Sequence, residues 1–312
     1  MNLEKVTIEI LLATFQSEAY LREQIDSILN QTDSNWTLLI HDGGSTDSTL
    51  EIVRSYEKKF PQKIRMLGSS RASACRNFSH LLEASSSELV MLCDHDDVWL
   101  PEKISVTRKK FIDETAKIPP GTPLLVFSDL TIVDKDLNMI YPSLMRYSNL
   151  DPKRLAFSQL LVQNVPHGNT MMLNSALRRL VFPIPQKAVM HDNWISLTAA
   201  AFGRIAYLDQ TTLLYRQHGC NVIGASCYSI PELIHKIHDG RRKLLLRWNL
   251  NVRQAQAFLE LNKKRLNPGQ LQMLELFSDI KHSNFVKRRY ILYRYRIWKT
   301  GLMRNIGMFL VI

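Results

Sequence analysis

Residues 88–99 read Glu-Leu-Val-Met-Leu-Cys-Asp-His-Asp-Asp-Val-Trp, an apolar run that ends in an acidic cluster. The run Glu88–Cys93 is short and mostly apolar, which predicts a strand buried on both faces of a sheet. Three carboxylates follow it within four residues, at Asp94, Asp96 and Asp97. Because parallel sheets bind ligands at the carboxyl ends of their strands, this stretch predicts an α/β fold with a site at that edge.

The same alternation of strand and helix extends to both sides of this stretch. Uncharged or weakly charged runs predict further strands at 6–15, 36–40, 63–67 and 124–128. Apolar residues at helical spacing predict helices at 19–30, 47–60 and 101–115, and a helix that carries Phe78, Leu81 and Leu82. This order predicts a mainly parallel sheet flanked by helices. Beyond residue 150 we expect a helix at 155–162, a strand at 170–173, a helix at 193–201, one or two strands at 205–215, and only helices from Pro231 onward.

The acidic cluster predicts a metal site. Three neighbouring carboxylates repel one another unless a cation neutralises them. Oxygen ligands suit Mg²⁺ or Mn²⁺, which also take oxygens from a substrate phosphate. The alternative is a solvated acidic loop that caps the helix beginning near Pro101. The position directly after a buried strand favours the metal.

A second polar segment, Asp42-Gly43-Gly44-Ser45-Thr46-Asp47, follows the strand at 36–40. Its glycines allow the backbone to approach a ligand, and Ser45 or Thr46 can cap a helix whose N-terminus favours anions. The carboxylate of Asp42 can accept the imide N–H of uracil or thymine. An ordinary turn with a helix cap explains the same residues.

Two later segments carry further candidates. In His191-Asp192-Asn193-Trp194, Asp192 can take a proton from a sugar hydroxyl that stacks on Trp194, or it can cap the helix at 193–201. In Tyr215-Arg216-Gln217-His218, Arg216 can bind phosphate and His218 can complete a metal shell, although a single Arg or His near a strand end is more often structural.

Taken together, these segments resemble family 2 glycosyltransferases with the GT-A fold, from about Thr7 to about Gly224. Ala13-Thr14-Phe15-Gln16 at the first strand end belongs to the same pattern. The acidic cluster, the segment 168–172 (Gly-Asn-Thr-Met-Met) and the segment 215–224 (Tyr-Arg-Gln-His-Gly-Cys-Asn-Val-Ile-Gly) are similar to bacterial rhamnosyltransferases. Those enzymes build O-antigen or cell-wall polysaccharide from dTDP-L-rhamnose.

The resemblance implies a role for each matched residue. Asp192 is the expected catalytic base. Donor-binding roles fall on Thr14, Gln16, Asp42, Arg76, Asn77, Asp94, His95, Asp96 and Arg216. Acceptor-binding roles fall on Trp99, His167, Gly168, Asn169, His191, Asn193 and Trp194. The expected ligands of Mg²⁺ or Mn²⁺ are Asp94, Asp96, Asp97 and His218, with Asp96 foremost.

The sequence departs from the family pattern at two places. It has Arg71-Ala72-Ser73 where relatives usually show Asn-x-Gly, which leaves the local backbone path open to question. It also has His41 where an acidic residue is common. Neither change removes a catalytic group.

The implied reaction is an inverting, metal-dependent transfer of L-rhamnose from dTDP-L-rhamnose to a hydroxyl of a lipid-linked glycan. A UDP-hexose or UDP-N-acetylhexosamine donor is the alternative. A sugar-1-phosphate nucleotidyltransferase is disfavoured, because it is expected to carry a glycine-rich loop with a basic residue right after the first strand. This chain has Ala13-Thr14-Phe15-Gln16-Ser17 there.

The formal charge of +11 is unevenly distributed. Residues 231–312 carry 17 Lys and Arg against 5 Asp and Glu, whereas the preceding residues carry 23 against 24. We therefore expect a catalytic domain at 1–228, with a donor part at about 1–130 and an acceptor part at about 131–228, followed by a basic helical region at 229–312. Such asymmetry indicates an anionic partner, either a membrane or a nucleic acid.

A membrane surface fits the basic region better than a nucleic acid, because no nucleic-acid motif is present. Lys281–Ile312 has 8 Lys and Arg, no Asp or Glu, and several aromatic residues. We expect a helix there that binds the cytoplasmic face of the bacterial inner membrane peripherally. The alternative is a helix packed on its own domain with a solvated basic face. We expect no signal peptide or spanning segment and four reduced cysteines, whereas the oligomeric state cannot be predicted.

Overall fold

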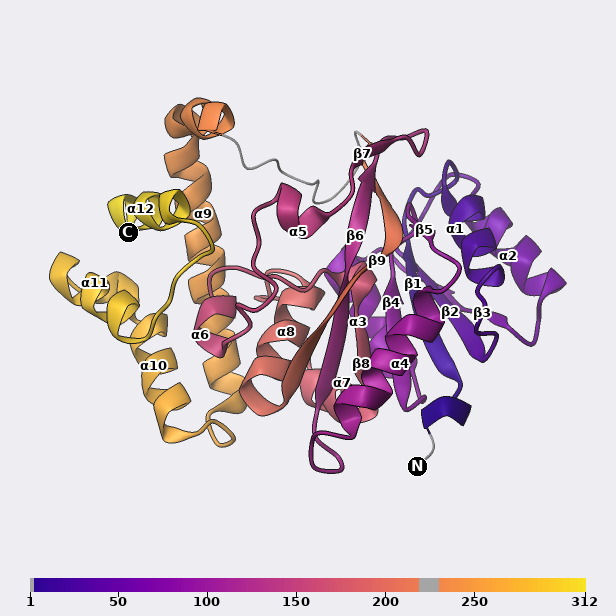
Figure 1. Ribbon diagram of the computed structural model, residues 1–312, viewed down its shortest axis with the longest axis horizontal. Coiled ribbons are helices and arrows are strands. Elements are labelled where there is room, and N and C mark those ends of the chain that lie inside the picture. The colour runs from indigo at the N-terminus through magenta and orange to yellow at the C-terminus, as the bar shows by residue number, and fades with distance from the viewer. Residues whose placement is uncertain (1–2, 219–229) are drawn as a thin grey trace.

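The computed structural model describes residues 3–218 and 230–312 (Figure 1). Within them, one nine-stranded sheet has the strand order β3-β2-β1-β4-β8-β6-β9-β5, and β7 pairs with β6. The strands are β1 (Ile8–Thr14), β2 (Trp36–Asp42), β3 (Ile64–Ser69), β4 (Leu89–Cys93), β5 (Val98–Trp99), β6 (Leu124–Val133), β7 (Met139–Tyr141), β8 (Met172–Asn174) and β9 (Arg204–Arg216). The predicted α/β architecture is confirmed.

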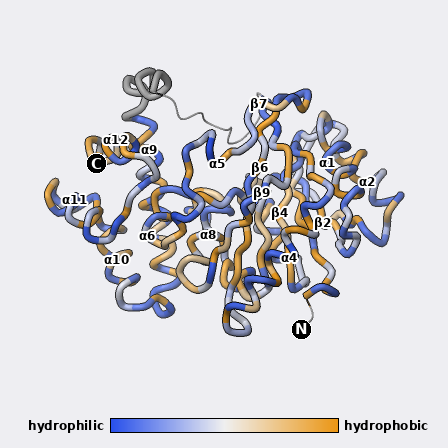
Figure 2. The backbone as a smooth tube through the Cα atoms, viewed as in Figure 1, coloured by the Kyte–Doolittle hydropathy of each residue, from blue (hydrophilic) through white to orange (hydrophobic). Residues whose placement is uncertain are grey.

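Strands β3, β2, β1 and β4 are parallel, and their alternate residues face two separate cores. Ile8, Ile10 and Leu12 pack with α1 (Leu21–Leu29), α2 (Thr49–Lys59) and α4 (Lys103–Thr115). On the other face, Leu11 and β4 residues Val90 and Leu92 pack with α3 (Ala74–Ala84) and α8 (His191–Phe202). Figure 2 shows the resulting apolar strands between helices of mixed hydropathy. This two-sided burial is what an uninterrupted apolar run predicts.

The second half of the sheet is mixed rather than parallel throughout. β8 lies antiparallel to both β4 and β6, whereas β9 runs parallel to β6. β6 extends to Val133, beyond the predicted end at Ser128, because the long strand β9 accompanies it to Arg216. Short elements connect this half: α5 (Leu144–Tyr147), α6 (Phe157–Leu160), the 3₁₀ turn η2 (Gly168–Thr170) and α7 (Ser175–Val181).

The described chain after β9 is helical, as predicted. Its elements are α9 (Ile230–Asn262), α10 (Pro268–Ser278), the 3₁₀ turn η3 (Ile280–His282), α11 (Phe285–Arg294) and α12 (Leu302–Val311). No helix of the described residues is long and apolar enough to cross a membrane. The predicted boundary near residue 228, the segment 219–224, Cys220 and Cys227 lie outside the described residues. Cys75 and Cys93 are free thiols.

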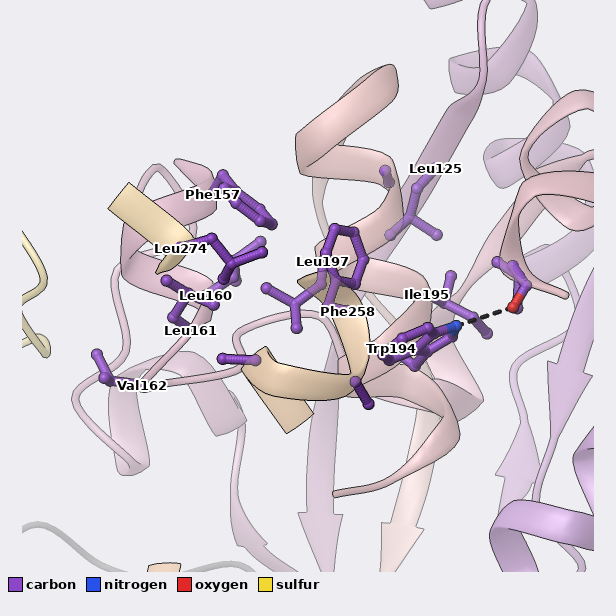
Figure 3. Close-up of a cluster of buried hydrophobic side chains, with 14 of the residues drawn as sticks. Leu125, Phe157, Leu160, Leu161, Val162, Trp194, Ile195, Leu197, Phe258 and Leu274 are labelled. Atoms are coloured by element: carbon purple, nitrogen blue, oxygen red, sulfur yellow. Dashed lines mark hydrogen bonds between the residues drawn. The ribbon is translucent and has the colours of Figure 1, made fainter. Parts of the chain in front are cut away.

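Helix α9 shares a hydrophobic core with helix α8, which covers one face of the sheet. Phe258 of α9 is fully buried and lies 5.1 Å from Trp194 of α8 and 5.4 Å from Phe157, measured between ring centroids. Figure 3 shows Trp194, Phe258 and Leu274 of α10 in one apolar cluster, with the Trp194 indole N–H donating to the carbonyl of Val181. The C-terminal helices are therefore packed onto α8.

Candidate active site at the carboxyl edge of the sheet

The ends of β1 and β2 form a closely braced turn around Asp42. This carboxylate is fully buried and accepts from the Thr14 hydroxyl (2.9 Å), the Ser45 hydroxyl (2.6 Å), the Ser69 hydroxyl (2.8 Å) and the backbone N–H groups of Gly44 and Ser45. Burial opposes ionisation, but these hydrogen bonds prevail and lower the pKa of Asp42. The expected bond from Asp42 to a nucleobase imide stays a prediction, and such a bond has to displace one of these donors.

Gln16 also supports this turn. The side-chain oxygen of Gln16 accepts from the backbone N–H of Thr46 (2.7 Å), and the backbone N–H of Gln16 donates to the Ser45 hydroxyl (2.9 Å). Gly44 has φ +89°, a conformation that favours glycine. Neither Ser45 nor Thr46 caps α2 as predicted; instead the carboxylate of Asp47 accepts from the N–H of Thr49 (3.1 Å). The neighbouring Phe15, to which the sequence assigned no role, is 53% exposed.

The predicted donor contacts of α3 divide into one exposed and one buried residue. Arg76 is exposed and can reach a ligand. Asn77 is 2% exposed, because its amide donates to the carbonyl of Thr14 (3.1 Å) and its oxygen contacts His41 Nδ1 (2.6 Å). The structure therefore corrects the donor-binding prediction for Asn77, which braces the turn from behind. The backbone path at 71–73 is also fixed, since the N–H of Ala72 donates to the carbonyl of Gly43 (3.3 Å).

The acidic cluster follows β4, and its carboxyl groups destabilise one another. Burial and the charges of Asp96 and Asp192 raise the pKa of the half-buried Asp94 to about 8. Burial and the same cluster raise the pKa of Asp97 well above its usual range. The cluster does not cap α4, whose N-cap residue is Glu102 without a side-chain bond, so the capping alternative is excluded. Carboxylates that crowd together at a strand end indicate a place for positive charge.

Asp97 is buried more deeply than the other predicted metal ligands. It is fully buried, accepts from the side-chain amide of Asn169 (2.6 Å) and faces the backbone N–H of Arg216 (3.4 Å). The carbonyl of Asn169 in turn accepts from the ammonium of Lys103 (3.0 Å), a lysine that is 1% exposed. Asp97 is therefore held inside the protein, where Asn169 supports it; the metal-ligand role of Asp97 and the acceptor contact of Asn169 stay predictions.

Arg216 is also an internal support. It is 2% exposed, and its guanidinium donates to the carbonyls of Asp96 (3.0 Å) and Lys135, forms an ion pair with Glu23, and stacks on Tyr20 at 4.6 Å. These contacts hold the acidic loop against α1 and β6. The predicted contact of Arg216 with the donor diphosphate stays a prediction, and such a contact has to displace one of these partners.

Asp96 and His218 form the best candidate for metal binding. Asp96 Oδ2 lies 2.9 Å from His218 Nε2, and both side chains are 11% exposed. The part of the chain that the structure describes contains no group of three His, Cys, Asp or Glu arranged to hold a metal. Magnesium is commonly held by one or two carboxylates together with substrate phosphate oxygens, so a site of this size fits that ion. The neighbouring His95 is half-buried beside them.

Asp192 lies in the first turn of α8 and does not cap that helix, because Met190 occupies the N-cap position. Its carboxylate accepts from the side-chain amide of Asn164 (3.1 Å) and from the backbone N–H of Asn193 (2.7 Å). Burial raises the pKa of Asp192 to about 6, although these bonds oppose the shift. Its charge acts on both Asp94 and Cys75, which places it between the acidic loop and α3.

Polar atoms without partners gather beside Asp192. They are the side-chain oxygen of Asn164, Nδ1 of His167 and both ring nitrogens of His191, all buried. His191 stacks on Phe78 at 3.9 Å, and burial lowers its pKa to about 3, so the ring is neutral. A Cβ on Gly168 would lie 2.8 Å from His191 Nε2, so this approach requires glycine. These buried atoms keep unused hydrogen-bonding capacity beside Asp192. No sequence motif points to Asn164.

Both tryptophans predicted to bind the acceptor are buried, and these predictions are wrong. Trp194 is 1% exposed because α9 covers it through Phe258, so no sugar can stack on it (Figure 3). Trp99 is 2% exposed in β5, and the ammonium of Lys103 lies 4.8 Å from its ring. Each tryptophan anchors a catalytic segment from behind.

A pocket of about 320 Å³ lies at the same edge of the sheet, and the sequence did not predict it. Met91 of β4 pairs with Met172 of β8, which pairs with Val126 of β6, so Asp129 is level with Asp94 two strands away. Asp129 lines the pocket together with Tyr207, Arg146, Asp209 and Gln210. Polar planar side chains and one aromatic ring suit a sugar.

Comparisons with known proteins identify the family and the fold. Residues 9–181 match the family described as Glycosyl transferase family 2. The chain is 26% identical over 230 residues to the dTDP-rhamnosyl transferase RfbG of Shigella flexneri, covering 69% of this chain and 74% of that protein. It also matches an uncharacterised protein of Mycobacterium tuberculosis with 26% identity over 68% of this chain, and spans only 59% of that relative's length.

Two solved structures share the fold. The first, residues 1–349 of TarS from S. aureus in complex with UDP-GlcNAc, has a TM-score of 0.56 at 16% identity, covering 98% of this chain and 90% of that chain. The second, the mannosyltransferase PcManGT from Pyrobaculum calidifontis in complex with GDP-Man and Mn²⁺, has a TM-score of 0.53 at 16% identity, covering 93% and 74%. The predicted GT-A fold is confirmed.

Proposed function

The chain belongs to glycosyltransferase family 2, and from that premise we propose that it transfers a sugar from a nucleotide diphosphate donor to an acceptor hydroxyl. The observation that carries this proposal is the meeting of Asp192 with the acidic loop at one edge of the sheet, where the charge of Asp192 acts on Asp94. In this proposal Asp192 is the base, and the acidic loop holds the metal that neutralises the leaving diphosphate. A displacement at an anomeric carbon requires both groups close together.

In the proposed reaction the configuration at the anomeric carbon is inverted. The acceptor oxygen forms a bond to that carbon while the bond to the diphosphate oxygen breaks, and the hydroxyl proton passes to Asp192. Asn164 and the N–H of Asn193 hold the carboxylate in place, and its raised pKa suits proton uptake near neutral pH. General base catalysis of this kind contributes about a hundred- to ten-thousandfold in rate.

We propose that Asp96 and His218 hold Mg²⁺ or Mn²⁺, with Asp94 near enough to join them through its charge. When bound, this ion neutralises the charge that develops on the leaving diphosphate. The fit rests on the 2.9 Å approach of Asp96 to His218 and on the excess of carboxylate charge around them. The Mn²⁺ complex of PcManGT, which shares the fold, supports the same ion class.

We propose dTDP-L-rhamnose as the donor and a lipid-linked glycan of bacterial surface polysaccharide as the acceptor. Support for the donor comes from the likeness to RfbG and from the motif resemblance. A UDP-hexose or UDP-N-acetylhexosamine is the second candidate, favoured by the likeness to TarS in its UDP-GlcNAc complex. On the acceptor side, the atoms without partners at Asn164, His167 and His191 can bind sugar hydroxyls, and the pocket beside Asp129 can receive a sugar further along the chain.

A screen of nucleotide sugars for hydrolysis and transfer, with and without Mn²⁺, tests this proposal. We expect turnover only with metal, and strongest with dTDP-L-rhamnose. Asp96→Ala should lose metal-dependent turnover. Asp192→Asn should bind dTDP with the parent's affinity in calorimetry but lose at least about a hundredfold in turnover, because it keeps the shape and removes the base.

Asp113→Asn is the matched control, because it removes an exposed carboxylate of α4 that pairs with Lys109 and lies in neither the site of Asp192 nor the pocket beside Asp129. It should keep the parent's donor hydrolysis. Parental turnover by Asp192→Asn refutes the base assignment, and tighter binding of GDP than of dTDP or UDP refutes the proposed donor class.

A further inference from the structure

The last two helices expose an unusual amount of apolar surface. On α11, Phe285, Val286, Tyr290 and Tyr293 are 60–74% exposed, and on α12, Leu302, Met303, Ile306 and Leu310 are 41–80% exposed. We call these eight residues the C-terminal apolar face. Leu302, Ile306 and Leu310 recur every fourth residue and so form one stripe along α12. Large exposed apolar groups gathered in one region mark an interaction surface.

The helices that carry this face are fixed to the protein. Their opposite sides bury Ile291, Leu292 and Met308 in the core that contains Trp194. The guanidinium of Arg288 donates to the carbonyl of Ile312 (2.9 Å), and that of Arg289 donates to the carbonyl of Phe309, which joins the end of α12 to α11. The apolar face is therefore presented by folded structure, at the opposite end of the molecule from α1 and α2 (Figure 1).

The segment that carries this face has charges of a single sign. Lys281–Ile312 contains 8 Lys and Arg and no Asp or Glu. Lys281, Lys287, Arg294 and Arg296 are exposed. Exposed cations beside exposed Phe, Tyr, Leu and Ile match an anionic lipid headgroup layer above its acyl chains. Pairing with a second copy of the same face would instead bring like charges together.

We propose that the C-terminal apolar face binds the surface of an anionic lipid bilayer, with the apolar side chains inserted at headgroup depth and the cations on the phosphates. No helix of the described residues can span the bilayer, so attachment is peripheral. This binding does not depend on the proposed transferase activity. The fold corrects the expectation of one helix over Lys281–Ile312: α11 and α12 are separated by a turn in which Arg296 and Gly301 have positive φ.

Sedimentation of the full-length protein with vesicles tests this proposal. We expect binding to vesicles that contain phosphatidylglycerol, little binding to pure phosphatidylcholine, and release at high salt. The apolar variant Tyr290→Ser/Tyr293→Ser/Leu310→Ser should weaken binding at least about tenfold, because it removes three of the eight inserting side chains. The charge variant Lys281→Glu/Lys287→Glu/Arg294→Glu should bind only at background level.

Matched controls separate the face from general surface properties. Met139→Ser/Ile140→Ser removes exposed apolar groups from β7, and Arg54→Glu/Lys58→Glu/Lys59→Glu reverses exposed cations on α2. Both should sediment like the parent. All variants are compared by thermal melting and donor hydrolysis, which surface changes should leave intact.

Two outcomes overturn the proposal. One is vesicle binding by the apolar variant at the parent's level. The other is a parent dimer in sedimentation equilibrium that the apolar variant abolishes while vesicle binding persists, because the face would then pair two copies. Parental turnover by Asp192→Asn would refute the proposed base without affecting vesicle binding, and loss of vesicle binding would not affect turnover, so the two proposals can fail separately.

Discussion

At the scale of single residues, Asp192 owes its proposed role to its surroundings. Burial raises its pKa to about 6, whereas the hydrogen bonds from Asn164 and Asn193 keep the rise moderate. A base must be deprotonated to act, so turnover at saturating metal and donor should fall about tenfold for each pH unit below 6 and level off above it. A pH profile of turnover measures this fall, which forms the acidic limb of the profile.

Donor affinity measured over the same pH range is the control, since Asp192 does not enter donor binding in this scheme. A turnover that stays level down to pH 4.5 would contradict the assignment. The Asn164→Ala variant removes one bond to the ionised form and should move the limb to higher pH. An unmoved limb would mean that Asn164 does not hold the carboxylate.

Asp94 makes a separate prediction about stability. Its pKa is raised to about 8 in the folded protein, against an ordinary value of 3.8. The folded state therefore binds a proton more tightly than the unfolded chain, so Asp94 costs stability increasingly as pH rises from about 4 to about 8. Without metal, Asp94→Asn should raise the free energy of unfolding at pH 8 by about 1–2 kcal/mol, a value reduced for solvent screening of this half-buried group.

Urea unfolding of the metal-free parent and variant at pH 5 and pH 8 measures this difference. The gain should shrink at pH 5, where the carboxyl is already protonated. Asp113→Asn, an exposed carboxylate paired with Lys109, serves as the control and should gain nothing. An equal gain at both pH values would show that Asp94 is not the origin of the effect.

At the scale of elements, α9 completes the core of α8. Phe258 is fully buried, stacks with Phe202, and packs against the rings of Trp194 (edge to face) and Phe157 (tilted). Phe258→Ala should lower the free energy of unfolding by about 3–5 kcal/mol, because it leaves a large cavity at this junction. Leu261→Ala on the same helix, where the side chain is 45% exposed, should change it by less than about 1 kcal/mol. Comparable losses in the two variants, measured by urea unfolding, would show that α9 does not stabilise α8.

The sequence predicts the strands of the parallel half well, because a short stretch of sequence is enough to recognise an apolar run that is buried on both faces. It predicts the positions of Asp42 and the acidic cluster at one edge, because strand ends align there. The antiparallel direction of β8 and the extension of β6 escape it, since β8 depends on pairing with β4 and β6, and the extension of β6 depends on pairing with β9 far along the chain.

Side-chain roles proved harder to predict than positions. Trp99, Trp194, Asn77, Asp97 and Arg216 were all predicted to bind a ligand or a metal, yet each is buried. Their burial depends on distant partners, such as Phe258 over Trp194 and Glu23 on Arg216. A local motif cannot distinguish a residue that touches a ligand from one that holds the loop in place.

At the scale of the whole molecule, charge and chemistry lie at different places. The proposed base and acidic loop belong to the electrically balanced first part of the chain, whereas α11 and α12 carry the cationic surface. If α11 and α12 bind the membrane, the carboxylates of the site lie away from the phosphates of the lipid headgroups. Attachment and turnover should therefore respond to different substitutions.

The shared core of α8 and α9 also bears on how the protein is made. Trp194 and its neighbours leave the ribosome before α9 does, so the aromatic surface of α8 stays uncovered until residues 230–262 have been synthesised. A chain interrupted in that interval would display this surface and invite chaperones or proteases. Quality control in the cell would thus remove transferase domains that had not yet acquired the helices proposed to bring them to lipid.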